Sequence, residues 1–384
     1  MKHLLIDIGS THIKWAIYNP ETKGWGMAGT VPFPPRLKNA LDVIFEVEVR
    51  EITSAVFSVL EEKRDEISGI LISCQMHGYI VTDPFCRPVT NYISWQDCRA
   101  ALSADGSGRS FLDTFVARYP GAIDSYSGSS LKVNLPAVSL WANRQLSPDI
   151  MKNGNCLFTL GSYIAYLLTG NNITHITDGA ATGFYIADSA KRNEKLDRCL
   201  RLPKLTKNFC VVGEWNAIPV FSPVGDHQAT FYGALAEKNQ YILNLGTAAQ
   251  LCTLCDRVID GSCENRPFFG GKILCTVSGL IGGRQILSAM AAGKEAGASL
   301  ANSMMENYKS ALKSLPERDS LIVTGGVSAH YPELIKDVCD RLAIPYTIQK
   351  SVDALYGMSL LLDETEMTGY EKNIRHYALR SSME

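Results

Sequence analysis

The sequence has 384 residues, of which 46% are hydrophobic and 20% charged, and its formal net charge is −2. This length is enough for two domains with full cores. The near-neutral charge argues against a nucleic-acid surface, which normally carries a basic excess. No uninterrupted apolar run approaches the ~18 residues of a bilayer-spanning helix, and no leader precedes the first apolar run. We therefore expect a soluble, cytoplasmic protein without a nucleic-acid or membrane partner.

Two apolar runs at the start of the chain flank a tight turn of Gly9, Ser10 and Thr11. Glycine lets the backbone bend and lets a ligand approach closely. Hydroxyls beside backbone N–H groups form the kind of concave anion site that holds phosphate. Asp7 lies inside the first run, where an unpaired charge is costly, and a magnesium ion carried by a nucleotide would explain it. The alternative is an ordinary hairpin in which Asp7 caps the turn.

Strands and helices alternate through the rest of the first half. The predicted strands cover 26–31, 67–73 and 92–95, and the predicted helices cover 41–63, 134–144 and 159–168; 171–177 is strand or loop. Polar residues follow the strand ends at 74–78, 96–99 and 178–183. Ligand sites of open α/β sheets lie at such strand ends. For Asp178 and its small neighbours, a structural turn is the favoured interpretation.

The second half begins by repeating the first turn. Residues 241–248 show the same order of apolar residues, glycine and hydroxyl, at Gly246 and Thr247, but an amide, Asn244, replaces the carboxylate. Two such strand–turn–strand units predict two halves built alike. Facing each other, the two turns could clamp a triphosphate from both sides. This arrangement resembles the actin-like ATPase superfamily.

Further elements complete the second half. A long helix is predicted over 286–314, and a strand over 321–324 runs into Gly325 and Gly326. After these come a helix with one apolar face, a strand at 346–348 and a helix at 354–362. The tail from residue 363 is polar, with at most one helix.

The eleven cysteines are odd in number and irregular in spacing. Neither property suits a secreted disulfide scaffold. Cys252 and Cys255 form a C-x-x-C pair inside a predicted strand, without a second pair at zinc-finger spacing. We expect buried, reduced thiols that pack as small apolar groups.

Three further blocks raise the resemblance to family level: residues 73–78 (Ser-Cys-Gln-Met-His-Gly), 95–99 (Trp-Gln-Asp-Cys-Arg) and 223–233, which begins Pro-Val-Gly-Asp-His. Together with both turns and Gly325-Gly326, and in the same order, they resemble the FGGY carbohydrate kinases over nearly the whole chain. Within that family the likeness is strongest to sedoheptulokinases, which also share runs like 266–269 and 282–284.

The resemblance implies an α/β fold of two actin-like (ribonuclease-H-like) ATPase domains with a central cleft. The N-terminal domain would cover 1–234 and a shortened C-terminal domain 235–384. The segment between Gly283 and Gly325 is shorter than in most members, and the common Gly-Glu-Arg loop is absent. A homodimer is left open.

The resemblance also implies roles for the acceptor side of the site. Asp226 matches the family's catalytic base, which would accept the hydroxyl proton during phosphoryl transfer; its alternative role is a helix N-cap. Met76 and His77 match the residues that hold the sugar, and His227 could contact it. Trp95 could stack on an apolar sugar face. Asp97 and Arg99, in the same block, are equally well explained as a structural ion pair.

The nucleotide side follows from the same resemblance. Asp7 would hold magnesium directly or through water. The phosphate-binding candidates are Gly9, Ser10, Thr11, Lys14, Gly246 and Thr247. Gly325 and Gly326 match the adenosine motif, where a side chain would block the nucleoside; the alternative is a simple strand-to-helix turn.

The sequence thus predicts an ATP- and magnesium-dependent kinase that phosphorylates the terminal hydroxyl of a ketose, with sedoheptulose to sedoheptulose 7-phosphate as the best single candidate. A kinase for xylulose or another ketose or polyol is the near alternative. Two remoter alternatives are a non-catalytic sugar- or nucleotide-binding protein and an actin- or chaperone-like ATPase. Retention of Asp7, Asp226 and both turns argues against the first, and the blocks at 73–78 and 95–99 argue against the second.

Overall fold

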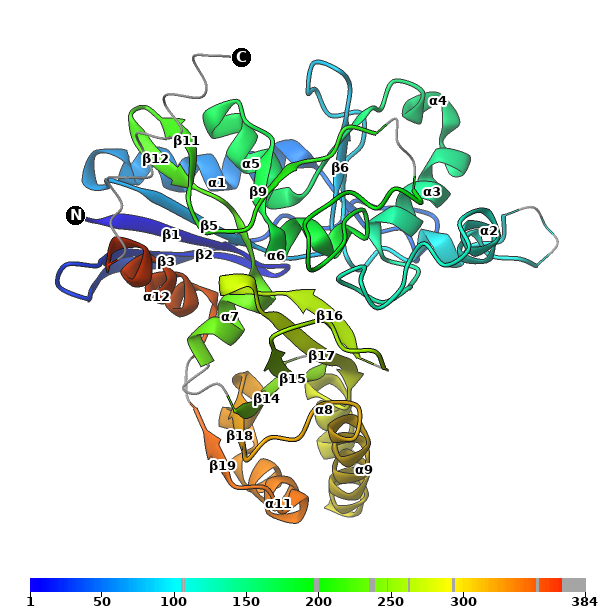
Figure 1. Cartoon of the computed structure of the whole chain (residues 1–384), viewed down its shortest axis with the longest axis vertical. Coiled ribbons are helices and arrows are strands. Elements are labelled where there is room, and N and C mark those ends of the chain that lie inside the picture. Colours follow the sequence, from blue (N-terminus) through cyan, green and yellow to red (C-terminus); the bar gives the residue numbers. More distant parts are fainter. Residues whose placement is uncertain are drawn as a thin grey trace.

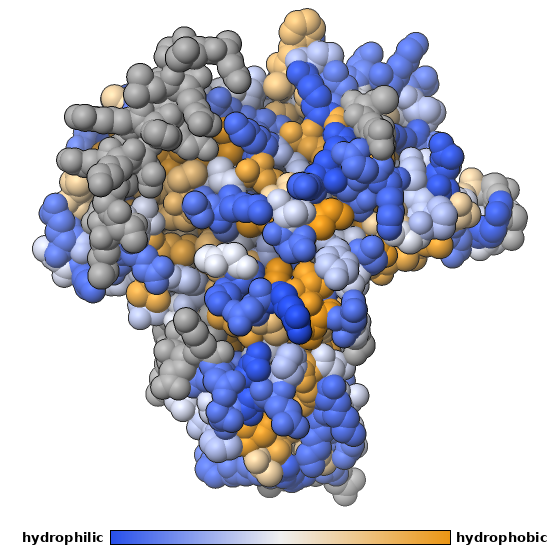
Figure 2. Space-filling model, in the orientation of Figure 1, coloured by the Kyte–Doolittle hydropathy of each residue, from blue (hydrophilic) through white to orange (hydrophobic). Residues whose placement is uncertain are grey.

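The structure is a computed structural model that describes residues 1–104, 106, 108–196, 200–234, 239–246, 248–261, 263–291, 294–349 and 352–367. Two mixed β-sheets with helices on their faces make up its core, one above the other in Figure 1. No helix among the described residues is long and apolar enough to cross a membrane. Hydrophilic residues cover most of the face shown in Figure 2, and hydrophobic ones gather there in small patches.

The first sheet has seven strands in the order β11–β12–β5–β1–β2–β3, with β13 beside β5. The bounds are β1 His3–Ile8, β2 His12–Asn19, β3 Gly24–Pro32, β5 Ile70–Cys74, β11 Val211–Trp215, β12 Ile218–Phe221 and β13 Val224–Gly225. The opening hairpin is confirmed, since β1 and β2 pair antiparallel around the Gly9 turn. Strand β5 runs parallel to β1, so their C-terminal ends meet at one edge of the sheet.

Helices cover both faces of this sheet because successive strand residues point to opposite sides. On one face, Leu4 and Ile6 pack with α1 (Val49–Lys63) and α5 (Leu160–Thr169). On the other, Leu5 packs with α7 (Asp226–Ala234) and α12 (Ala354–Met367). All these apolar side chains come from strands that are buried on both sides, as near-continuous apolar runs predict.

A subdomain with its own core extends from the first sheet. This core is built mainly from α2 Phe111–Arg118, α3 Pro136–Leu146 and α4 Pro148–Met151. The other elements that precede the second sheet are β4 Glu46–Val47, β6 Ile80–Thr82, β7 Tyr92–Ile93, β8 Cys156–Phe158, β9 Ile173–His175, α6 Ile176–Gly179 and β10 Lys204–Thr206, with short 3₁₀ turns at Arg64–Glu66, Arg99–Ala101 and Ala180–Thr182. One prediction was wrong here: the helix expected over 41–63 begins only at Val49. Glu46 and Val47 pair with β7 instead.

The second sheet has six strands in the order β16–β17–β15–β14–β18–β19. The bounds are β14 Gln240–Leu245, β15 Ala249–Cys255, β16 Glu264–Pro267, β17 Ile273–Leu280, β18 Ser320–Thr324 and β19 Tyr346–Ile348, with a 3₁₀ turn at Phe269–Gly271. The hairpin β14–β15 with β18 parallel to β14 repeats the arrangement of β1, β2 and β5. The two halves are therefore built alike, as the repeated turn predicted.

Helices α8 (Gly283–Ala291), α9 (Lys294–Leu312), α10 (Gly326–His330) and α11 (Pro332–Leu342) accompany the second sheet. The helix expected over 286–314 corresponds to α8 and α9, which cover most of that range among the described residues. The helix expected over 354–362 is longer and runs to Met367, so residues 363–367 of the supposed polar tail are helical. The rest of the tail lies outside the described residues.

Helix α12 follows the second sheet in sequence but returns to the first. It crosses α7 so closely that a Cβ on Gly357 would lie 1.7 Å from the carbonyl oxygen of Ala229. At its far end, the hydroxyl of Tyr18 in β2 donates to Asp363, at 3.0 Å. The two sheets fall on either side of residue 234, while α12 packs on the first; the division into domains 1–234 and 235–384 stays a prediction.

Candidate active site

Three strands of the first sheet end side by side and carry the acidic part of the site. Asp7 on β1 and Val224 on β13 both lie opposite Ser73 on β5. The Ser73 hydroxyl donates to Asp7 Oδ1 at 2.7 Å. Asp226 comes two residues after Val224 and begins α7. The parallel register therefore brings Asp7 and Asp226, far apart in sequence, to the same edge of the sheet.

The two carboxyl groups sit in an environment that disfavours their charge. Burial raises the pKa of Asp7 to about 6. Burial and then the charge of Asp7 raise the pKa of Asp226 to about 8, against the opposing hydrogen bond from the backbone N–H of His227. That N–H meets Asp226 Oδ1 at 2.7 Å. An acid with a pKa near neutrality is suited to exchange a proton during catalysis.

This edge of the sheet could bind a magnesium ion only if a bound ligand supplied further oxygen atoms. Asp7 offers a buried carboxylate oxygen, and oxygen is the donor that Mg²⁺ prefers. Among the described residues, however, no group of three or more His, Cys, Asp or Glu side chains could hold a metal. Magnesium commonly keeps several waters and binds through one or two carboxylates plus substrate phosphates. Asp7 matches that mode.

Met76 and His77 follow β5 directly and reach the same edge. His77 has a positive φ of 63°, which is strained for a residue with a side chain and points to a constraint at the site. Its Nε2 lies 3.1 Å from Ser129 Oγ. The Met76 sulfur would lie 2.7 Å from a Cβ at Gly225, so the glycine before Asp226 makes room for Met76.

His227 turns a buried polar atom toward the site. Its Nδ1 pairs with Arg266 Nη1 at 3.1 Å, and its ring packs on Phe231. Its Nε2 and Gln250 Oε1 are both buried, and a side-chain hydrogen bond with Gln250 raises the pKa of His227 against the larger effects of burial and of Arg266. Burial lowers the pKa of both His77 and His227, so both rings are neutral near pH 7.

Charged residues of β16 reach this site from the second sheet. Arg266 donates through Nε and Nη2 to Glu264 Oε2, at 2.9 and 2.7 Å, while its Nη1 meets His227. Glu264 Oε1 accepts from Ser130 at 2.8 Å and from Ser278 at 3.1 Å, and Lys132 Nζ is 3.5 Å away. Burial opposes the charge of Glu264, but Arg266 and Lys132 outweigh it and hold its pKa below the usual range.

Sequence reasoning missed Glu264 and Lys132 as site residues and quoted Arg266 only within a family run. The signal available was charge inside a buried strand: Glu264 and Arg266 alternate within the four residues of β16, all buried. Buried charges need partners; Glu264 and Arg266 pair with each other, and Glu264 has further partners in Ser130 and Lys132 of the other half.

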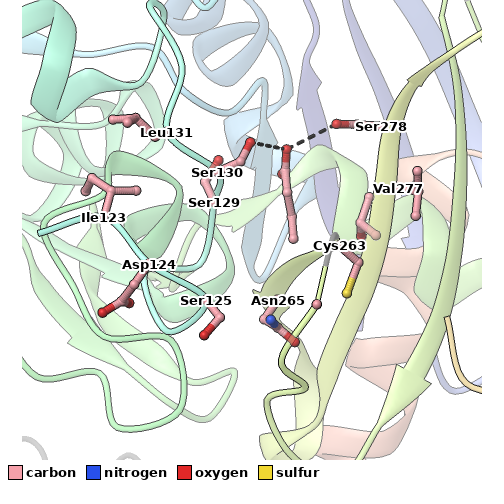
Figure 3. A pocket seen from close by; sticks show the side chains of 13 residues that line it. Ile123, Asp124, Ser125, Ser129, Ser130, Leu131, Cys263, Asn265, Val277 and Ser278 are labelled. Carbon is pink, nitrogen blue, oxygen red and sulfur yellow. Dashed lines mark hydrogen bonds between the residues drawn. The ribbon is translucent and has the colours of Figure 1, made fainter. Parts of the chain in front are cut away.

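A cavity of about 450 Å³ adjoins this charged group. Figure 3 shows Ser129, Ser130 and Leu131 on one side of it and Cys263, Asn265 and Ser278 on the other. The dashed lines there run from Ser130 and Ser278 to the carboxylate of Glu264. Its lining mixes hydroxyl, amide and carboxylate groups, a chemistry suited to a polyhydroxylated ligand. Ser129 links the cavity to His77.

The glycine turns lie at corresponding ends of the two sheets. Ser10 and Thr11 are exposed beyond β1. Beyond β14, the carbonyl of Gly246 accepts from the N–H of Gly283 at 2.8 Å. Thr247 lies outside the described residues. Lys14 Nζ is 3.9 Å from Asp353 Oδ2, at the start of α12.

Gly325 and Gly326 follow β18, next to β14. Gly325 has φ 102°, and a Cβ there would lie 2.6 Å from the carbonyl oxygen of Leu245 and 2.7 Å from Asn244 Oδ1. A Cβ on Gly326 would face open space. Gly325 is thus required by packing of the two strand ends, whereas Gly326 leaves room beside the turn. Asn244, which replaces the carboxylate, contributes to this packing.

The block at 95–99 is mainly structural. The Arg99 guanidinium is buried and pairs with Asp97 at 2.8 Å and with Glu46 at 2.6 Å; it also donates to Asn143. This network favours the ion-pair interpretation of Asp97 and Arg99. Trp95 is 38% exposed, and its carbonyl accepts from Asn134. Its stacking on a sugar stays a prediction.

Asp178 fits the structural interpretation as well. It is buried and accepts from the hydroxyls of Thr159 and Thr174, which fix the loop around it. Burial raises its pKa to about 6.

Two similar sheets, each with a glycine turn at the end of its first strand, define the actin-like (ribonuclease-H-like) ATPase fold. Solved structures agree: a xylulose kinase from Lactobacillus acidophilus superposes with a TM-score of 0.79 at 16% identity, covering 95% of this chain and 90% of that one. A Plasmodium falciparum glycerol kinase with ADP gives 0.75 at 15% identity, covering 94% and 90%. The predicted fold class is confirmed.

Sequence comparison places the chain within this fold. Residues 3–233 match the model of the N-terminal domain of the FGGY family of carbohydrate kinases. The chain therefore belongs to the FGGY family.

Individual relatives are distant. An uncharacterized sugar kinase of Archaeoglobus fulgidus is 25% identical over 257 residues, which are 59% of this chain and 51% of that protein. A Thermococcus onnurineus glycerol kinase is 26% identical over 61% of this chain and 50% of its own length, and human sedoheptulokinase is 22% identical over 64% and 58%. The chain spans about half the length of the curated relatives it matches, and these include several glycerol kinases.

Proposed function

We propose that this chain catalyses ATP-dependent phosphorylation of the terminal hydroxyl of a ketose, with sedoheptulose as the first candidate acceptor. The observation that carries the proposal is Asp226, a carboxyl group with a pKa of about 8 at the same edge of the sheet as Asp7 and hydrogen-bonded to the N–H of His227. Family membership and the shared fold support kinase chemistry.

In this proposal Asp226 accepts the proton of the acceptor hydroxyl as its oxygen bonds to phosphorus. Asp7 would hold magnesium, which supplies positive charge beside the transferring phosphoryl group. Because the charge of Asp7 is one cause of the raised pKa of Asp226, compensation of that charge would lower the pKa of Asp226. The base would then be deprotonated when the nucleotide is bound and protonated in its absence.

The acceptor would lie along the neutral histidines. An acceptor hydroxyl that accepts from one partner and donates to another could bind both His227 Nε2 and Gln250 Oε1, which are buried within hydrogen-bonding reach of each other. Met76 and His77 would position the middle of the sugar, and Trp95 its apolar face. The polar cavity beyond Ser129 gives room for a longer carbon chain, which is why sedoheptulose precedes xylulose here.

We assign the nucleotide to the glycine turns. The phosphates would contact the residues Gly9, Ser10, Thr11, Lys14, Gly246 and Thr247, and the adenosine would lie at Gly325 and Gly326. The open space at Gly326 supports the second assignment. We also propose that the protein is cytoplasmic, that it has no nucleic-acid or membrane partner, and that it forms a homodimer.

A panel assay tests the proposal. ADP release is measured with sedoheptulose, xylulose, other ketoses, aldoses and glycerol, and phosphorus–proton NMR of the product locates the new ester. We expect the highest kcat/KM with a ketose and an ester on its last carbon. Turnover only with glycerol or aldoses would refute the acceptor, and release of ADP from none of them would refute kinase activity.

A further inference from the structure

Three cysteines meet on one face of the second sheet. Cys275 on β17 lies directly opposite Thr253 of β15 and Asn265 of β16. Because side chains alternate along a strand, Cys255, two residues after Thr253, and Cys263, two residues before Asn265, point to the same side as Cys275. All three are buried in the core between this sheet and its helices.

Their sulfur atoms are in contact. Cys275 Sγ lies 2.8 Å from Cys255 Sγ, and Cys263 is also within hydrogen-bonding reach of Cys275. A disulfide needs about 2.05 Å, so the first pair would have to close by less than about 1 Å. Among the described residues, no group of three or more His, Cys, Asp or Glu side chains could hold a metal ion.

The two outer cysteines each border a cavity. Cys255 lines a cavity of about 880 Å³ between the second sheet and the end of α12, and Cys263 lines the cavity of about 450 Å³ beside Glu264. Arg318 Nη2 is 3.9 Å from Cys255 Sγ. The contact with Cys275 and then the Arg318 charge lower the pKa of Cys255 against the effect of burial. A cysteine whose pKa is lowered and whose sulfur is in contact with a second thiol is the arrangement of an oxidisable cysteine pair.

We propose that Cys255 and Cys275 form a reversible disulfide when the protein meets hydrogen peroxide, with Cys263 as a third thiol that exchanges into it. The Cys255 thiolate attacks one peroxide oxygen, the O–O bond breaks, and hydroxide leaves and is protonated to water. The sulfur of Cys275 then attacks the sulfenic sulfur of Cys255, the S–O bond breaks, and the Cys275 proton leaves with the hydroxide as a second water. Two thiols are oxidised and one peroxide is reduced to two waters.

Exchange would carry the bond toward the candidate active site. The Cys263 thiolate attacks the sulfur of Cys275 and releases the thiolate of Cys255. Cys263 directly precedes Glu264, whose contacts with Ser130 and Lys132 join the two halves. Both bonds would join diagonal positions of neighbouring strands, which are farther apart than directly opposite ones. Such bonds store strain and are reduced easily, so the modification is a switch rather than a permanent crosslink.

The test uses the purified full-length protein treated with hydrogen peroxide. We expect an intact mass lower by two hydrogens, a Cys255–Cys275 or Cys263–Cys275 peptide in digests made without reductant, and return of the original mass with dithiothreitol. Linked peptides that join other cysteines in the same amount, or an unchanged mass, would overturn the proposal.

Single variants separate the roles. Cys275→Ala should abolish the linked peptides and leave Cys255 to be oxidised further to sulfinic acid. Cys252→Ala is the matched control, because Cys252 lies on the same strand but packs on the opposite face; it should form the disulfide normally. Full disulfide formation in Cys275→Ala would refute the central position of Cys275. If a variant fails to fold, the digest of the unmutated protein still shows whether the disulfide forms.

Discussion

Replacing Asp226 by asparagine should have opposite effects on turnover and on stability. Asp226→Asn keeps the size of the side chain and its contact with the N–H of His227 through the amide oxygen, but it removes the base. We expect kcat to fall by about 10²–10⁴-fold, with ATP binding little changed.

The stability effect follows from the raised pKa. Asp226 has a pKa of about 8 in the folded protein and an ordinary value of 3.8. The folded state therefore binds the proton more tightly, and stability falls as pH rises from about 4 to about 8. At 1.36 kcal/mol per pKa unit the loss is at most about 6 kcal/mol. Since Asp226 is only partly buried, we expect a gain of about 2 kcal/mol for the variant at pH 8 to 9, and none at pH 4.

Denaturant unfolding between pH 4 and 9 measures the second effect, and coupled ADP release measures the first. Asp65→Asn, the same change at a highly exposed carboxylate, should alter neither kcat nor the pH dependence of stability. Near-normal turnover of folded Asp226→Asn would remove Asp226 from the mechanism. Parallel pH–stability curves for the variant and the parent would show that the Asp226 carboxyl carries no desolvation cost.

Three further predictions concern its neighbours. Asp7→Ala should weaken the magnesium dependence of activity and leave sugar binding without nucleotide intact. Because it removes a negative neighbour of Asp226, it should also move the acidic limb of the kcat/KM profile to lower pH. An unchanged magnesium titration would show that Asp7 has a structural role. His77→Ala should raise KM for the sugar far more than KM for ATP, and equal increases would contradict a sugar-binding role. Arg266→Gln should leave Glu264 without its closest cation and lower the free energy of unfolding by about 3 kcal/mol, with partial rescue in Arg266→Lys; a thermal melt equal to that of the parent would show that the pair is dispensable.

The sequence predicted the turns and strands that depend on residues close together in the chain. Both glycine turns, their flanking strands and the strands at 67–73 and 321–324 could be predicted from short apolar runs. The parallel pairing of β5 with β1 and of β18 with β14 was not predicted. The helix start at Val49 could not be predicted, because the strand character of Glu46 and Val47 depends on pairing with residues 92–93. The same holds for Arg266, which meets His227 across 39 residues of sequence and from the other sheet. Contacts between halves leave no periodic pattern in either partner.

The return of α12 to the first sheet sets the order in which the chain can complete its fold during synthesis. The ribosome delivers β1, β5 and α7 early, yet the apolar face around Leu5 and Leu71 gains its cover of Leu355 and Met358 only after the whole second sheet has been made. The contact between Tyr18 and Asp363 spans 345 residues. Such distant closure slows folding, and the uncovered face is one that a chaperone would recognise on a nascent or truncated chain. The first half therefore completes its fold late, although it is translated first.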